Sequence, residues 1–312
     1  MSSLLLSVVQ VIVVLACAPF ATGLVRWAKA RMQGRMGASP WLPYVTLATL
    51  FRKEMVISPV TSWVFRVVPF VVLGTTLLIA AVVPVLSTRG ALAGNDDIIL
   101  LAGLLALGAV FLVLGGLDPG SAFGGMGASR EMTIAALIEP ALLTTFAAFA
   151  AAGRTTSLSG ILAAGGLSVW THPALLLSVI AFILVLFAEN ARYPVDNPAT
   201  HLELTMVHEA MVLEYSGPYL AMLELASSVK LTVFAVLLGS LLAPSTLHGA
   251  PGVSVLVALL WMVGKVVVGM LLLALWESTI PKMRFYRMQE YTAIAFCVAL
   301  AGLVLTILPS VV

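Results

Sequence analysis

The chain has 312 residues, of which 61% are hydrophobic and only 10% are charged, and its mean hydropathy is +1.10. A water-facing surface needs about a quarter or more charged residues, so this composition excludes a soluble protein and indicates an integral membrane protein. A net charge of +2 is no signal for binding polyanions, so we expect no nucleic-acid partner.

The two cysteines, Cys17 and Cys297, both lie inside apolar runs. They cannot form a disulfide framework, a cysteine zinc site or an iron–sulfur cluster held by this chain alone. If electrons move through a complex that contains this chain, another subunit must carry them. The N-terminal run lacks the basic segment of a signal peptide, so we interpret it as a first transmembrane helix.

Apolar runs of roughly 17–25 residues predict about eight transmembrane helices, and hence an all-α membrane protein with a single domain over residues 1–312. The runs are residues 4–24, 63–86, 98–117, 132–152, 170–188, 218–243, 253–276 and 291–309. Most basic residues outside them lie in or beside the connections 25–62, 118–131, 189–217 and 277–290. By the positive-inside rule these functional loops face the cytoplasm, and both termini face outward.

The first inner loop, residues 25–62, mixes basic side chains with Trp27 and Phe51, which is typical of a helix lying in the membrane interface. Its basic residues can anchor to anionic membrane lipid or dock a protein, and the sequence leaves both open. The second inner loop, residues 118–131, is rich in glycine but lacks the features of a phosphate cradle. We expect its glycines to let the backbone turn tightly against a partner.

The third inner loop, residues 189–217, holds five of the 14 acidic residues: Glu189, Asp196, Glu203, Glu209 and Glu214. Its prolines predict an irregular first part, followed by a helix that starts at Asn197 or Thr200 and ends near Gly217. On that helix an acidic stripe and a histidine stripe lie nearly opposite, which suits carboxylates enclosed in a polar space. Such carboxylates would have raised pKa values and exchange protons near neutral pH.

The alternative is that these acids are simply solvated at the cytoplasmic surface. The two histidines of this loop, His201 and His208, lack the spacing of a helical zinc site, so we predict no metal site.

The apolar runs contain charged residues at Glu139, Glu224, Lys230 and Lys265. A charge in the membrane costs several kcal/mol unless it is paired or hydrated, so each is a candidate functional residue. The alternative, that the side chain reaches the interface from its helix end, fits Glu224 best.

The third loop carries the motifs that identify a family. AENARYPVD, residues 188–196, and EYSG, residues 214–217, resemble the A-E-x-N-R-x-P-F-D and E-Y-S-G motifs of the complex I subunit 1 family. HLELTMVHEAMVLEYSG is similar to the branch found in energy-converting [NiFe] hydrogenases such as formate hydrogenlyase. Arg130 and Glu139 match the family's R-x8-E element, and the resemblance extends over essentially the whole chain.

The resemblance implies the membrane subunit of a respiratory-type hydrogenase complex in a prokaryotic cell membrane, with no catalytic residue of its own. Its partners would be the hydrogenase large and small subunits, an iron–sulfur protein and antiporter-like membrane subunits. Those partners would hold the iron–sulfur clusters and the [NiFe] centre. Because Val195 replaces the family's usual Phe, the resemblance argues against a quinone site.

The resemblance also implies roles for particular residues. It places Glu139, Glu189, Arg192, Asp196, Glu203, Glu209 and Glu214 in the expected proton path, to which the charges inside the apolar runs add Glu224, Lys230 and Lys265. The residues expected to dock the cytoplasmic arm are Arg31, Arg35, Arg52, Lys53, Arg130, Arg284 and Arg287. Two alternatives remain open, namely a quinone-site subunit of a complex I-like dehydrogenase and a stand-alone ion or solute transporter.

Overall fold

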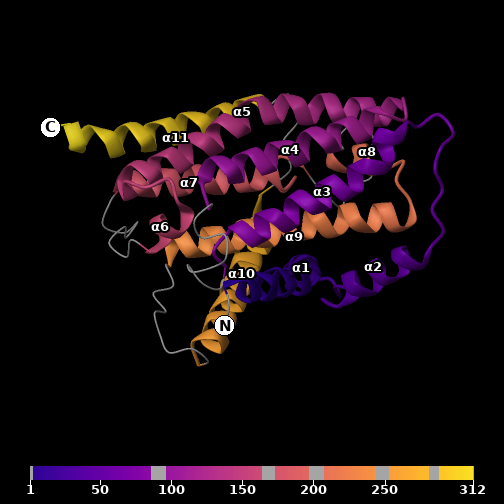
Figure 1. Cartoon of the computed structure of the whole chain (residues 1–312), viewed down its shortest axis with the longest axis horizontal. Coiled ribbons are helices and arrows are strands. Elements are labelled where there is room, and N and C mark those ends of the chain that lie inside the picture. Colours follow the sequence, from indigo (N-terminus) through magenta and orange to yellow (C-terminus); the bar gives the residue numbers. More distant parts are fainter. Residues whose placement is uncertain are drawn as a thin grey trace.

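A computed structural model describes residues 3–85, 96–163, 173–196, 207–243, 253–280 and 288–311 of the chain, and all the helices in these ranges are labelled in Figure 1. In chain order they are α1 (Ser3–Met32), α2 (Leu42–Arg52), α3 (Trp63–Val82), α4 (Ile98–Leu117), α5 (Ala122–Gly153), α6 (Leu158–Ala163), α7 (Pro173–Glu189), α8 (His208–Val212), α9 (Gly217–Leu242), α10 (Val253–Thr279) and α11 (Met288–Val311).

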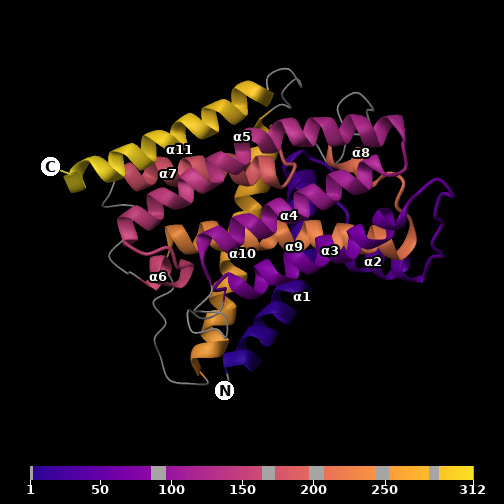
Figure 2. The same cartoon turned by 45° about the horizontal axis from the view of Figure 1, so that its top comes forward.

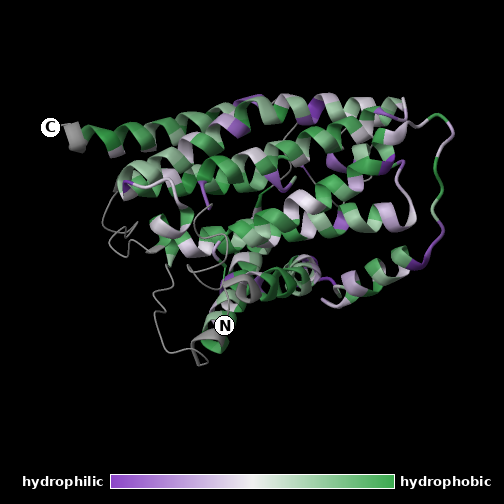
Figure 3. Cartoon of the chain, viewed as in Figure 1, coloured by the Kyte–Doolittle hydropathy of each residue, from purple (hydrophilic) through white to green (hydrophobic). Residues whose placement is uncertain are grey.

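Seven of these helices are long and apolar enough to cross a membrane, and a shorter apolar helix spans Ala174–Glu189. Hydrophobic residues cover most of the length of the helices in Figure 3. A helix satisfies its own backbone hydrogen bonds, which is why apolar runs of this length fold as helices in lipid. The predicted all-α class and the prediction of about eight spans are confirmed.

The helices are not all aligned. Figures 1 and 2 show α10 steeply inclined to the bundle formed by α3, α4, α5, α7, α9 and α11. In Figures 1 and 2 the C-terminus lies at the left end of the molecule, whereas α2 and α8 lie toward the right end. That both termini face outward, and which end of the bundle faces the cytoplasm, stay predictions.

Aromatic side chains pack the core between α5, α7 and α9. The ring of Phe182 on α7 lies 5.8 Å from that of Phe146 and 5.7 Å from that of Phe234, measured between centroids. A second apolar cluster lies nearer to α8, where Phe65 and Tyr215 stack at 3.9 Å. This second cluster supports the loop that follows α8.

The prediction of a loop over residues 118–131 is wrong beyond Ser121, because α5 begins at Ala122. The hydroxyl of Ser121 accepts a hydrogen bond from Gly124 N–H and so caps the helix. The glycines allow close helix packing instead of a turn. A Cβ atom at Gly127 would lie 2.9 Å from the Ala210 Cβ on α8, so only glycine lets α5 approach α8 this closely.

The third inner loop also differs from its prediction. The predicted helix start, at Asn197 or Thr200, lies outside the described residues. The described part is helical only over the five residues of α8, so a continuous helix ending near Gly217 is wrong. Gly217 adopts a φ of 54°, in the left-handed region that suits glycine, and begins α9.

Two smaller features concern the connections between the long helices. The first transmembrane helix continues to Met32, so the basic segment beginning at Val25 extends α1 and only α2 forms a separate helix in that loop. The outer connection after α5 contains the short helix α6. Asp96 stabilises it, because its carboxylate accepts hydrogen bonds from Ser157 Oγ at 2.8 Å and Ser159 N–H at 2.6 Å.

Candidate functional site

A buried ion pair joins the end of α7 to the middle of α9. Nζ of Lys230 lies 2.6 Å from Oε2 of Glu189, and only 20% and 10% of the two side chains are exposed. A lysine in the apolar body of a helix needs such a partner, because an isolated charge there costs several kcal/mol. The sequence identified both residues as candidates, and the structure brings them together.

A cavity of about 60 Å³ lies beside this pair. Its lining includes Glu131 of α5 and His208 of α8 in addition to Glu189 and Lys230. One water molecule needs roughly 15 Å³ of such a cavity, so this cavity has room for about four water molecules. Four titratable groups from four helices therefore line one small cavity whose remaining walls are mostly apolar.

Glu131 is the residue of this cluster that the sequence analysis missed, because it ended the segment interpreted as a loop. The signal was present in the chain. Ser121 follows a Pro-Gly turn and is a suitable helix N-cap, which would have started the helix earlier and placed Glu131 within it.

The turn after α7 supports the cluster. Asp196, which is 4% exposed, accepts hydrogen bonds from the N–H groups of Val207 at 3.2 Å and His208 at 3.4 Å. A carboxylate at the first N–H groups of a helix stabilises its N-terminus. Asp196 therefore holds α8, and with it His208, against the cavity.

His208 is held neutral. Burial lowers the pKa of its imidazole to about 4, and the nearby positive charges of Lys230 and Arg192 act in the same direction, while Asp196 acts in the opposite one. A neutral imidazole has one donor nitrogen and one acceptor nitrogen, so at neutral pH it can pass a proton along a hydrogen-bonded chain.

A larger cavity of about 370 Å³ adjoins the first. The two cavities share lining residues that include Asn190, Ala191 and His208. The charged residues of the larger cavity are Arg26, Arg192, Asp196, Glu209 and Glu224. Titratable groups therefore continue from one cavity to the other, and His208 lines both.

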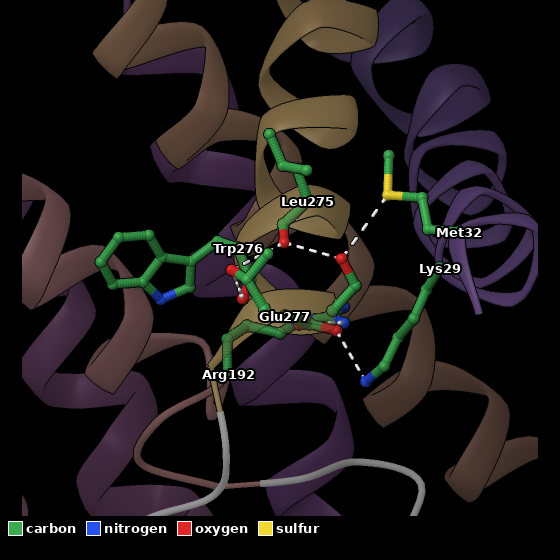
Figure 4. Close-up of polar contacts among 8 residues, drawn as sticks. Lys29, Met32, Arg192, Leu275, Trp276 and Glu277 are labelled. Carbon is green, nitrogen blue, oxygen red and sulfur yellow. Dashed lines mark hydrogen bonds and ion pairs between the residues drawn. The ribbon is translucent and has the colours of Figure 1, made fainter.

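A second buried ion cluster lies close to this turn. Glu277, at the end of α10, is 3.2 Å from Lys29 of α1 and 3.5 Å from Arg192 (Figure 4). Glu277 stands at the boundary between an apolar run and a loop, so its position in the sequence did not mark it as a candidate. Only the fold shows that it is buried.

The remaining predicted proton-path residues divide into three groups. Glu139 is partly buried on α5, two turns beyond Glu131, and lines neither cavity. Glu214 is exposed, and Lys265 lies apart from the cluster, where it donates a hydrogen bond to Ser240 Oγ at 3.0 Å. Glu203 lies outside the described residues.

The predicted docking residues lie mostly at the surface. Arg31, Arg35, Arg52 and Lys53 are exposed in the segment from the end of α1 to the end of α2. Arg130, on α5, is partly buried and donates a hydrogen bond to Met126 Sδ at 3.5 Å. Arg284 and Arg287 lie outside the described residues.

Comparison with known proteins identifies the family. A family model described as NADH dehydrogenase matches residues 4–307. The chain belongs to this family, the complex I subunit 1 family. The resemblance noted in the third-loop motifs is thereby confirmed.

Relatives within the complex I subunit 1 family cover almost the whole chain. Hydrogenase-4 component C of Escherichia coli (strain K12) is 32% identical over 93% of this chain and 91% of its own length. Formate hydrogenlyase subunit 4 of the same organism is 31% identical over 90% and 92%. An NADH-quinone oxidoreductase subunit of Paraburkholderia xenovorans (strain LB400) is 24% identical over 89% and 82%.

A solved structure supports the same fold. One chain of the membrane-bound sulfane sulfur reductase (MBS), an archaeal respiratory membrane complex, matches with a TM-score of 0.86. The match covers 98% of this chain and 100% of that chain at 20% identity. With its apolar helices and these relatives, the protein is a multi-pass protein of a prokaryotic cell membrane.

The arrangement of the potential metal ligands bears on the question of a metal site. Within the described ranges, no group of three or more His, Cys, Asp or Glu side chains is arranged to hold a metal ion.

Proposed function

We propose that this chain is the membrane-anchoring and ion-coupling subunit of a respiratory-type hydrogenase complex. It is similar over nearly its full length to subunits of hydrogenase-4 and formate hydrogenlyase. Electron transfer takes place in a docked arm that holds the iron–sulfur clusters and the [NiFe] centre. This chain links that transfer to the movement of protons, or of sodium ions, through its buried carboxylates.

The observation that carries the coupling role is the cluster around the 60 Å³ cavity. Lys230 and Glu189 form a close pair, and Glu131 and His208 face the same space. Because like charges resist simultaneous ionisation in a buried site, Glu131 and Glu189 compete for one counter-ion, Lys230. A change of charge at one carboxylate therefore changes the proton affinity of the other.

Proton transfer through the cluster needs only groups within the chain and a few waters. A proton that reaches His208 from the larger cavity passes to a carboxylate at the smaller one, where Lys230 has stabilised the negative charge. When that carboxylate becomes neutral, Lys230 turns toward the remaining ionised one. Glu139, further along α5, is the next acceptor in the proposed path, and Asp196, Glu209 and Glu224 supply its entrance.

The exposed basic residues between α1 and α2 suit contact with the cytoplasmic arm. Arg31, Arg35, Arg52 and Lys53 are exposed between the end of α1 and the end of α2, and Figure 1 shows α2 toward the same end of the molecule as α8. Exposed charges mainly set the orientation and the rate of association. We therefore assign these residues to docking of the hydrogenase and iron–sulfur subunits, and the membrane-embedded surface to lipid and to antiporter-like subunits.

The test uses Glu189→Gln and Lys230→Gln variants of the intact complex in sealed membrane vesicles, with hydrogen production and ion movement measured together. Both variants should keep the complex assembled and lose most ion movement per hydrogen formed. Glu290→Gln, which removes an exposed carboxylate at the start of α11, is the matched control. Normal ion movement in both cluster variants would contradict the proposal, as would full activity of the isolated chain.

A quinone-site subunit is the second candidate, favoured by the 370 Å³ cavity and by the similarity to an NADH-quinone oxidoreductase subunit. A photoreactive quinone analogue that labels residues 189–217 in the complex, and is displaced by excess quinone, would favour it. A hydrogenase complex predicts no displaceable label there. Ion or solute flux through the purified chain alone in liposomes would instead support a stand-alone transporter.

A further inference from the structure

Glu277 is a buried carboxylate that joins three separate parts of the fold. Only 2% of its side chain is exposed. Its Oε2 lies 3.2 Å from Nζ of Lys29, and its Oε1 lies 3.5 Å from Nη1 of Arg192. Figure 4 shows these side chains meeting from α1, from the end of α10 and from the turn after α7.

The negative charge of Glu277 compensates the buried positive charges of Lys29 and Arg192. The side chains of Lys29 and Arg192 are 18% and 12% exposed, and Nζ of Lys29 also lies 4.3 Å from the centre of the Tyr193 ring. Burial lowers the pKa of Arg192, and the negative charge of Glu277 opposes that shift. Within the described ranges neither cation forms an ion pair with another carboxylate, so loss of Glu277 would leave two buried positive charges, which is strongly destabilising.

The backbone of Arg192 also lies at the centre of the turn that runs from Glu189 to Asp196. Its N–H donates to Phe187 O at 2.8 Å, which ties the turn to α7. Its carbonyl accepts hydrogen bonds from the N–H groups of Val195 at 2.9 Å and Asp196 at 3.2 Å. A displacement of Arg192 would therefore move Asp196 directly.

Each end of this turn contacts a different part of the site. Glu189, at the start, pairs with Lys230, and Asp196, at the end, accepts the N–H groups at the start of α8. The contact between Arg192 and Glu277 lies between these two ends. It is an ion pair and not a close hydrogen bond, because Oε1 of Glu277 accepts no hydrogen bond from the part of the chain that the structure describes.

We infer that Glu277 is a positioning residue: by holding Arg192 it fixes the turn 189–196, so that Glu189 meets Lys230 and Asp196 caps α8. The functional meaning of this position rests on the proposed function, because the turn arranges the proposed proton cluster. A simple packing role would need only the volume of the side chain. Positioning through Arg192 needs a negative charge at residue 277.

The experiment compares Glu277→Gln, which keeps volume and removes charge, with Glu277→Asp, which keeps charge on a shorter side chain. Both are made in the intact complex, and Glu290→Gln is the control. Hydrogen–deuterium exchange of residues 187–196 is the direct readout. We expect exchange there to rise on the order of 100-fold in Glu277→Gln and by much less in Glu277→Asp, as for loss of one partner of a buried ion pair.

Exchange in α3 and α4, which contribute no residue to the ion cluster, should stay within about twofold of the parent complex. Unchanged exchange over residues 187–196 in Glu277→Gln overturns the inference, and so does an equal rise in every helix. If Glu277→Gln does not assemble, Glu277→Asp decides: a rise confined to residues 187–196 supports the inference, and no rise or a general one overturns it.

Ion movement per hydrogen formed separates this inference from the proposed function. A local rise in exchange together with reduced ion movement supports both. A local rise with normal ion movement supports the positioning role and contradicts the coupling role of the cluster.

Discussion

The ion pair between Lys230 and Glu189 gives the sharpest prediction, because its geometry sets the size of the effect. Two unit charges 2.6 Å apart attract by about 6 kcal/mol at an effective dielectric constant near 20. Desolvation offsets part of this attraction, while removal of one partner leaves the other charge buried. We therefore expect Lys230→Met alone to lower the free energy of unfolding by about 3–5 kcal/mol.

The double variant Lys230→Met/Glu189→Met should be less damaging than Lys230→Met alone, because no uncompensated charge remains. The assay is reversible unfolding of the purified chain in mixed micelles, with both single variants and the double variant forming a double-mutant cycle. Lys53→Met, at an exposed position at the end of α2, is the control and should change stability by less than about 0.5 kcal/mol. A coupling energy below about 1 kcal/mol would refute the reasoning.

Three further predictions test the frame around the site. Gly127→Ala should lower the free energy of unfolding by about 1–3 kcal/mol, because the added Cβ would meet Ala210 and Val207. Gly125→Ala is the control and should be neutral or slightly stabilising, because the space beside Gly125 is open. Equal effects of the two variants in unfolding assays would contradict the close packing of α5 on α8. Gln10→Leu should lower the free energy of unfolding by roughly 2–3 kcal/mol, because Gln10 Nε2 donates hydrogen bonds to Ala80 O at 2.8 Å and Val83 O at 2.6 Å at the end of α3. Gln289→Leu, at an exposed position, is the control. A loss of stability no larger than in that control would argue against the contact. Because the pKa of His208 is about 4 when folded and about 6.5 when unfolded, the unfolded chain binds more protons between these values, so stability should fall as the pH is lowered from about 6.5 toward 4. His208→Asn should flatten that part of the pH–stability curve, and an unchanged slope would show that His208 is not held neutral by the fold.

The sequence allowed much of the site to be predicted because its charges are so rare. Glu189, Asp196, Arg192 and Lys230 stand out in a chain that is 10% charged, and the structure places all four at or beside the two cavities. Sequence reasoning could not pair them, since partners on different helices have no fixed spacing along the chain. Lys230 and Glu189 are 41 residues apart.

Helix boundaries were the source of the main errors. A glycine-rich segment after Asp118 resembles a loop when judged by propensity, yet close packing against α8 makes glycine the residue that fits there. Because that segment was interpreted as a loop, Glu131 was treated as its last residue and not as part of the buried cluster. The short α8 was likewise unpredictable, because its start is capped by Asp196, 11 residues before Val207.

The sequence by itself determined the membrane class, the approximate spans and the family, because about 20 apolar residues in a row have one stable form in a bilayer and the third-loop motifs are long. Only the tertiary structure decided which charges share a buried space. Lys29 and Glu277 are 248 residues apart and meet because α1 packs beside the inclined α10. The free energy of a buried charge depends on its neighbours in space, and local sequence does not contain that information.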